Sequence, residues 1–135
     1  MPTLPTAALP FLTALSPVTG ATPTGSSGEI DFYLSADTTK LAFRLAHTVG
    51  APKAVTLTRK GSAAPVTIAC PALASSAGVS GAQGYCDVDP AVKVAGTTPV
   101  LTYGDLELGV LTATITSEAN MTGELSGPVV LPKSQ

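Results

Sequence analysis

The side chains that could carry catalysis in this sequence are few and widely spaced. The chain has a single histidine, His47, and two cysteines among its 135 residues. A copper or zinc site needs several imidazoles or thiolates, and a serine nucleophile would have only His47 as its base. His47 ends an apolar strand pattern, so we interpret it as a structural histidine held by hydrogen bonds. The sequence therefore predicts no enzymatic activity, no catalytic residue, no metal site and no bound cofactor.

Carboxylate pairs raise calcium binding as the other candidate chemistry. Glu29 and Asp31 are two residues apart, as are Asp87 and Asp89, so each pair points to one side of an extended segment. Calcium takes about six to eight oxygen ligands, and neither pair belongs to an Asp-x-Asp-x-Asp-Gly run. We interpret both pairs as solvated surface residues. The same interpretation is given to two carboxylates further along the chain, Asp105 and Glu107.

The two cysteines, Cys70 and Cys86, enclose 15 residues rich in Ala, Ser and Gly. In the chain-entropy model, a disulfide that closes such a loop stabilises the folded state by about 3 kcal/mol. It would indicate an oxidising, extracellular or particle-borne location. The alternative is a pair of reduced thiols that behave as small buried hydrophobic residues. Because the small polar residues give little reason for two core positions, the sequence favours a disulfide with an exposed loop between the cysteines.

Composition excludes several classes of partner. The seven Lys and Arg residues are scattered and the formal net charge is −2, so no basic stripe is available to bind nucleic acid. Aromatic residues make up 4 % of the chain. This low content argues against aromatic surfaces on which the bases of a single-stranded nucleic acid stack, and against aromatic-lined clefts for sugars or cofactors. No apolar run approaches the length of about 18 residues that suggests a membrane span.

The first 18 residues are predicted to form an extended arm, followed by a single domain over residues 19–135. Four prolines prevent a regular helix there, and the stretch lacks the basic start and uninterrupted apolar core of a signal peptide. Exposed apolar side chains usually mark an interface. We therefore expect the arm to be mobile on an isolated monomer and to dock on a neighbouring subunit. The predicted interface residues are Leu4, Leu9, Phe11, Leu12 and Leu15.

The rest of the chain alternates in the manner of β-strands. Glu29–Leu34 and Lys40–Ala46 place apolar residues two apart and are separated by turn formers, which predicts an antiparallel hairpin. Thr102 can cap one short helical turn. The spacing of the strands is typical of an all-β sandwich or barrel. Further strands are predicted over Ala54–Arg59, Val66–Ala69, Val110–Thr116 and Gly123–Gly127, with a short one after Pro90.

The C-terminal part of the chain resembles a known family. The segments Leu101-Thr-Tyr-Gly-Asp105 and Gly123-Glu-Leu-Ser-Gly127, with a Gly-led strand between them, are similar to the closing pattern of the chordin-type (CHRD) domain. Order and spacing extend the resemblance over about residues 28–130. It implies an antiparallel immunoglobulin-like or superoxide-dismutase-like β-sandwich. Thr56-Leu57-Thr58 stands near the place of the family's usual His-x-His pair, so any role of those histidines is not carried over.

Two functions are left by these exclusions. The first is a non-enzymatic structural subunit of a larger assembly, such as a decoration or stabilising protein of a bacteriophage capsid, located on a virion or extracellular particle. Its partners would be other protein subunits, further copies of this chain included. The alternative is a secreted bacterial CHRD-like module that binds a protein or a surface polymer. The apolar N-terminal stretch favours the assembly.

Overall fold

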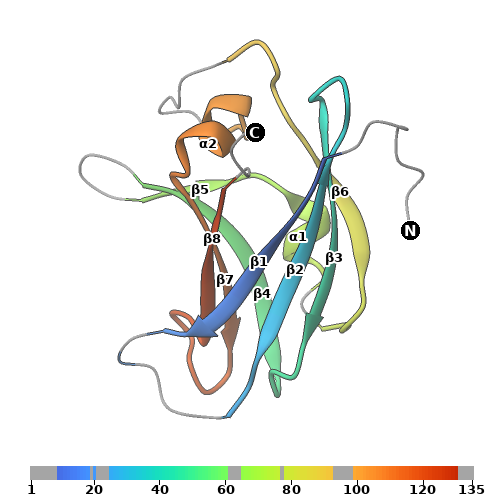
Figure 1. The fold of residues 1–135 in the computed structure, drawn as a ribbon. Coiled ribbons are helices and arrows are strands. Elements are labelled where there is room, and N and C mark those ends of the chain that lie inside the picture. Colours follow the sequence, from blue (N-terminus) through green and yellow to red (C-terminus); the bar gives the residue numbers. More distant parts are fainter. Residues whose placement is uncertain are drawn as a thin grey trace.

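The computed structural model describes residues 9–18, 20, 25–60, 65–76, 78–92 and 99–130. These residues form an all-β fold of eight antiparallel strands in one curled sheet, with two short helices (Figure 1). The all-β class is thus confirmed, whereas the sandwich type stays a prediction. The strands are β1 (Leu9–Pro17), β2 (Gly28–Leu34), β3 (Lys40–His47), β4 (Pro52–Arg59), β5 (Val66–Ile68), β6 (Gln83–Asp87), β7 (Leu111–Ser117) and β8 (Leu125–Val129). The helices are α1 (Pro71–Ala74) and α2 (Tyr103–Leu108).

The strand β1 lies in the middle of the sheet, whose order is β5-β4-β7-β8-β1-β2-β3-β6. Residues Leu9–Leu15 of β1 pair with β2, and Ser16 and Pro17 pair with β8. Figure 1 shows β1 running between the β2, β3 and β6 half of the sheet and the half formed by β8, β7, β4 and β5. One N-terminal strand therefore provides the continuity of the sheet.

The hairpin of β2 and β3 is confirmed in both position and register. The predicted segments Glu29–Leu34 and Lys40–Ala46 lie within these two strands, and Phe32 pairs with Phe43 at the centre. Both phenylalanines point into the core, because residues of one parity share one face of a strand.

A compact turn built on Asp37 closes this hairpin. Its carboxylate accepts hydrogen bonds from the hydroxyls of Thr39 and Ser35, both at 2.7 Å. These bonds favour the charged form and lower the pKa of Asp37 to about 2. The turn is therefore held by local side-chain bonds.

The other predicted strands are found with small shifts. The strands β4, β5 and β7 match the predictions over Ala54–Arg59, Val66–Ala69 and Val110–Thr116. The strand β8 begins later than predicted, at Leu125, and continues through Pro128.

The strand predicted after Pro90 is not found at Ala91 or Val92, and the residues that follow these two lie outside the described part of the chain. The strand in this region is β6, which ends at Asp87 and pairs with β3. The Asp89 carboxylate accepts a hydrogen bond from the backbone N–H of Ala91 at 3.0 Å, so the chain turns at Pro90.

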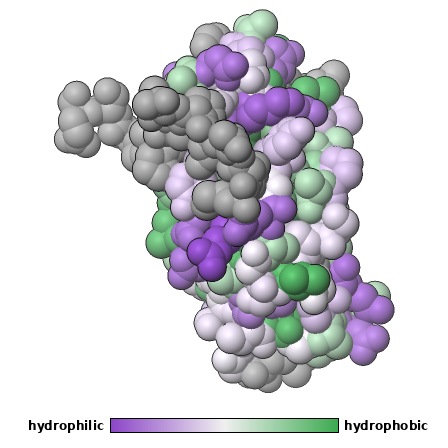
Figure 2. Space-filling model, turned by 90° about the vertical axis from the view of Figure 1, so that its right-hand side faces the viewer, coloured by the Kyte–Doolittle hydropathy of each residue, from purple (hydrophilic) through white to green (hydrophobic). Residues whose placement is uncertain are grey.

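The inward-facing side chains of all eight strands contribute to one hydrophobic core. Its largest members, such as Phe32, Phe43 and Leu57, are at most 2 % exposed. Viewed from the side on which β6 lies, the surface is mostly hydrophilic or pale, with separate hydrophobic spots (Figure 2). Burial of apolar area in this core supplies most of the stability of the fold.

The N-terminal arm is the main correction to the sequence-based predictions. Residues 9–17 form β1 in the sheet of the same chain, so the boundary predicted at residue 18 does not separate an arm from the domain. Leu15 is 6 % exposed, and the Phe11 ring stacks on that of Phe32 with centroids 5.2 Å apart. Proline prevents a helix but is compatible with a strand wherever its missing N–H is not needed. Two of the apolar side chains that predicted docking on a neighbour, Phe11 and Leu15, therefore pack on the chain's own core.

The approach of β8 to β1 is unusually close at Gly127. A Cβ atom at this position would clash with the carbonyl oxygen of Ala14 and lie 2.9 Å from Cγ2 of Thr13. The Thr13 hydroxyl donates a hydrogen bond of 3.0 Å to the carbonyl of Pro128. Glycine is required at residue 127 because the two backbones meet there.

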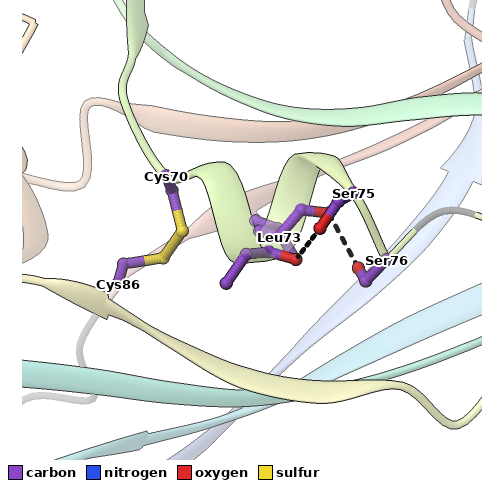
Figure 3. Close-up of a disulfide and its surroundings, with 6 residues drawn as sticks. Cys70, Leu73, Ser75, Ser76 and Cys86 are labelled. Carbon is purple, nitrogen blue, oxygen red and sulfur yellow. Dashed lines mark hydrogen bonds between the residues drawn. A yellow bond between two sulfur atoms is a disulfide. The ribbon is translucent and has the colours of Figure 1, made fainter.

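A disulfide joins Cys70 and Cys86, whose Cα atoms are 5.2 Å apart. Cys70 follows β5 and Cys86 lies in β6, so the bond links the two edge strands of the sheet. The helix α1 begins directly after Cys70 and carries Leu73, which is fully buried (Figure 3). The predicted disulfide is confirmed. The segment between the cysteines is more than the exposed loop that was predicted, because α1 packs against β6 and β4.

Replacing both cysteines by alanine should lower the free energy of unfolding by about 3 kcal/mol and the melting temperature by about 10 °C, because the unfolded chain loses a covalent loop. Calorimetry of the oxidised and substituted proteins measures this. Mass spectrometry after alkylation without reductant should find Cys70 and Cys86 of the native protein unalkylated, because both sulfur atoms are held in the disulfide. Two alkylated cysteines would contradict the disulfide.

The position of β1 can be tested with two leucines of one strand. Leu15→Ala should destabilise the isolated monomer by about 2–5 kcal/mol, because it opens a cavity in the core. Leu12→Ala should change stability by less than about 0.5 kcal/mol, because Leu12 is 57 % exposed. Urea unfolding measures both values. If both substitutions changed the free energy of unfolding by the same small amount, the result would instead support a mobile arm.

Candidate interaction face

His47 lies at the end of β3 beside a shallow depression. Its Nδ1 accepts a hydrogen bond of 3.1 Å from the backbone N–H of Val49. The depression has a volume of about 350 Å³ and is lined by Ser27, Gly28, Glu29, Ala46, His47, Thr48 and Ser80. The hydrogen bond agrees with the interpretation of His47 as a structural histidine.

The carboxylate pairs proposed as solvated surface residues are not clustered with further described side chains that could bind a metal ion. Asp87 forms an ion pair with Lys40, and Asp89 accepts the bond that closes the turn at Pro90. Within the residues that the structure describes, no three His, Cys, Asp or Glu side chains are grouped so that they could hold a metal ion. In the same part of the chain, no helix is long and apolar enough to cross a membrane.

The interpretation of Asp105 as a solvated surface residue is wrong, because Asp105 forms a buried ion pair with Arg59. Arg59 Nε and Nη2 donate to the two carboxylate oxygens at 2.6 and 2.7 Å, and the two side chains are 2 % and 0 % exposed. Arg59 Nη2 also donates to the carbonyl of Val100. Arg59 follows Val55 and Leu57 on the inward face of β4, so the strand alternation itself directs this charge into the core.

The same carboxylate also begins α2. The Thr102 hydroxyl accepts a hydrogen bond of 3.1 Å from the Asp105 N–H, and Asp105 Oδ2 accepts one of 3.0 Å from the Thr102 N–H. Such a capping box satisfies backbone donors that a helix start leaves unpaired. Burial alone would raise the pKa of Asp105, but the hydrogen bonds from Arg59 and Thr102 outweigh it and hold that pKa below its ordinary value.

A further buried carboxylate, Glu124, joins the turn between β7 and β8. It is 3 % exposed and accepts hydrogen bonds from the Ser117 hydroxyl at 2.6 Å and from the amide of Asn120 at 3.4 Å. The Ser26 hydroxyl also donates to it. Like Asp105, this acidic side chain holds loops together instead of presenting chemistry to solvent.

The predicted interface residues have different positions in the structure. Leu4 lies outside the described residues, and the backbone of Leu9 pairs with Leu34. Phe11 is partly buried against the core, and Leu15 is inside it, so Leu15 is excluded as an interface residue. Leu12 alone among the described side chains of this set is exposed.

Leu12 lies on the outer face of the half of the sheet formed by β1, β2, β3 and β6. It pairs with Asp31, and in the same cross-strand row Asp31 pairs with Arg44 and Arg44 with Gln83. Beside Leu12 is an open depression of about 230 Å³, lined by Phe11, Leu12, Asp31, Phe32 and Tyr33.

The next row of this face carries two of the chain's three tyrosines. Tyr33 pairs with Ala42, and Ala42 pairs with Tyr85. All three side chains point to the outer face by strand alternation, where Tyr85 is 48 % exposed, Tyr33 is half-buried and Ala42 is buried. We call Tyr33, Ala42 and Tyr85 the tyrosine strip, and the strip together with the row of Leu12 forms the candidate interaction face.

Sequence reasoning missed the tyrosine strip for one identifiable reason. The alternation of Glu29–Leu34 already places Tyr33 on the outer face, but Tyr85 was assigned to a loop. Only its pairing with β3 in the folded chain brings it next to Ala42.

Comparison with family models, curated proteins and solved structures finds no match to this chain. The resemblance to the CHRD domain therefore stays a prediction.

The ion pair predicts an acid-dependent loss of stability. A folded-state pKa below the ordinary value means that the charge of Asp105 stabilises the protein above about pH 4, and this contribution is lost as the pH falls toward the lowered pKa. At pH 7, Asp105→Asn should destabilise by about 3–5 kcal/mol, because Arg59 is left buried without its charge partner. Urea unfolding at pH 7 and pH 3 should show the difference from the parent protein shrinking in acid.

Glu107→Gln is the matched control, since Glu107 lies on the same helix and is exposed. It should change stability at pH 7 by less than about 0.5 kcal/mol. Equal effects of the two substitutions would contradict the structural role of Asp105.

Proposed function

We propose that the chain is a non-enzymatic structural protein that acts as a subunit of a larger assembly, such as a decoration or stabilising protein of a bacteriophage capsid. The observation that supports this proposal is Leu12, an apolar side chain 57 % exposed in the middle of a sheet face. An apolar side chain beside an open depression is a suitable anchor for a partner surface. The docking surface is thus the outer face of β1 and β2, in place of the free arm expected from the sequence.

The disulfide fits a location on a virion or another extracellular particle. Disulfides persist in oxidising surroundings and are rare in the reducing cytosol. A bond between the two edge strands also suits a protein that is exposed to varying conditions outside a cell.

The second candidate is a secreted module that binds a protein or a surface polymer. The disulfide supports it equally, and the tyrosine strip favours it specifically. Tyrosine is enriched at binding surfaces because its ring offers apolar area and its hydroxyl a polar contact.

The assembly role predicts that Leu12→Asp weakens self-association, because a charge replaces the apolar anchor at the contact. Leu108→Asp is the matched control, since Leu108 is 58 % exposed and lies on α2, away from this face. Size-exclusion chromatography with light scattering, over a range of concentrations, should show oligomers for the parent chain and for Leu108→Asp only. Equal effects of the two variants would contradict the proposed docking face, and a parent chain that is monomeric at every concentration would contradict a contact between copies of this chain.

A further inference from the structure

We propose that the tyrosine strip binds a neutral polysaccharide chain, with the rings of Tyr33 and Tyr85 lying against the faces of its sugar rings. This inference rests on the second function proposed above, the surface-binding module, and names the class of polymer. It does not depend on docking through Leu12.

The backbone positions of the two tyrosines suit an extended polysaccharide. Tyr33 and Tyr85 are in register with Ala42 on the strand between them. Neighbouring strands are separated by about 4.8 Å, so the two tyrosines are about 10 Å apart across the sheet. This distance is close to the length of two linked sugar rings in an extended chain. The middle residue on β3 is Ala42, whose small side chain is only 3 % exposed, so the surface between the two tyrosines is formed by atoms that already cover this alanine.

The ring of Tyr85 is held in place before any ligand arrives. The Nζ atom of Lys40 lies 4.8 Å from the centroid of this ring. Lys40 also forms an ion pair with Asp87 in the neighbouring strand, which favours this position of its ammonium group. A ring that is already restrained loses less conformational entropy on binding.

The charges around the strip balance each other. On one side Asp31 stands opposite Arg44 in the register of β2 and β3, and on the other side Lys40 forms an ion pair with Asp87. Each side therefore carries one positive and one negative group, and a charged polymer gains no net attraction. These groups and Gln83 offer donors and acceptors on both sides of the rings, which suits the hydroxyl groups of an uncharged sugar.

The surface on this side of the molecule is better suited to a sugar chain than to the core of a protein interface. In the part of this side that is not drawn in grey, Figure 2 shows separate hydrophobic spots among hydrophilic and pale residues. The centre of a stable protein interface is depleted in charge and more apolar. A narrow strip of rings between polar rows instead offers stacking with hydrogen bonds along its length.

Native affinity electrophoresis of the full chain tests the proposal. The probes are two neutral polymers, hydroxyethylcellulose and barley β-glucan, and one anionic polymer, alginate. The parent chain should be retarded by at least one neutral polymer and not by alginate. Tyr85→Ala should weaken the retardation about tenfold, as expected for the loss of one stacked ring. Tyr85→Phe should retain it within about twofold, because the ring is kept.

Three results would overturn the inference. These are no retardation by either neutral polymer, equal retardation by alginate and by the neutral polymers, or equal retardation of the parent chain and Tyr85→Ala. Met121→Ala is the control for a general surface effect, since Met121 is 66 % exposed and lies outside this face. Light scattering of the same variants separates polysaccharide binding from assembly. If Tyr85→Ala loses oligomers and the parent chain binds no polymer, the tyrosine strip is a protein interface. A loss of oligomers in Leu12→Asp tests only the proposed assembly and not polysaccharide binding.

Discussion

Two strands share the backbone of β1, and the rest of the sheet depends on that sharing. Over most of its length β1 pairs with β2, but its last residues pair with β8. The change of partner is possible only where β8 comes close enough, which requires the absence of a side chain at Gly127. Thr13 then adds a side-chain bond to β8. Without this junction the two halves of the sheet would share no ladder of hydrogen bonds.

The residues that suggested a family resemblance have local structural reasons in this chain. The Leu-Thr-x-x-Asp turn is a capping box, in which Thr102 and Asp105 satisfy each other's backbone donors. In the closing Gly-Glu-x-x-Gly segment, Glu124 holds the preceding turn and Gly127 admits β1. Acidic side chains, which elsewhere bind metals or act in catalysis, are thus used here to fix loops. Their burial leaves the tyrosine strip and Leu12 as the distinctive features of the exposed face.

The limits of sequence reasoning here follow from the range of the interactions. The hairpin of β2 and β3 was predictable because alternation and turn residues are local signals. The partner of Arg59 was not, because Asp105 is 46 residues away in the sequence. An inward-facing arginine nevertheless signals a buried acceptor, and this signal was available from the alternation of β4. The strand β1 was missed because its prolines and consecutive apolar residues obscure the period of two. Tyr85 was missed with β6, whose glycine and polar neighbours resemble a loop.

The disulfide between Cys70, which follows β5, and Cys86 in β6 also affects how two molecules of this protein can associate. The outermost strands of an open sheet present unpaired backbone groups, and another chain can add a strand there and start a growing fibre. In this protein the two outermost strands are tied to each other through Cys70 and Cys86, and α1 packs beside them. The disulfide limits how far these two edge strands can separate when the sheet fluctuates. It thereby disfavours polymerisation of the protein through its own backbone.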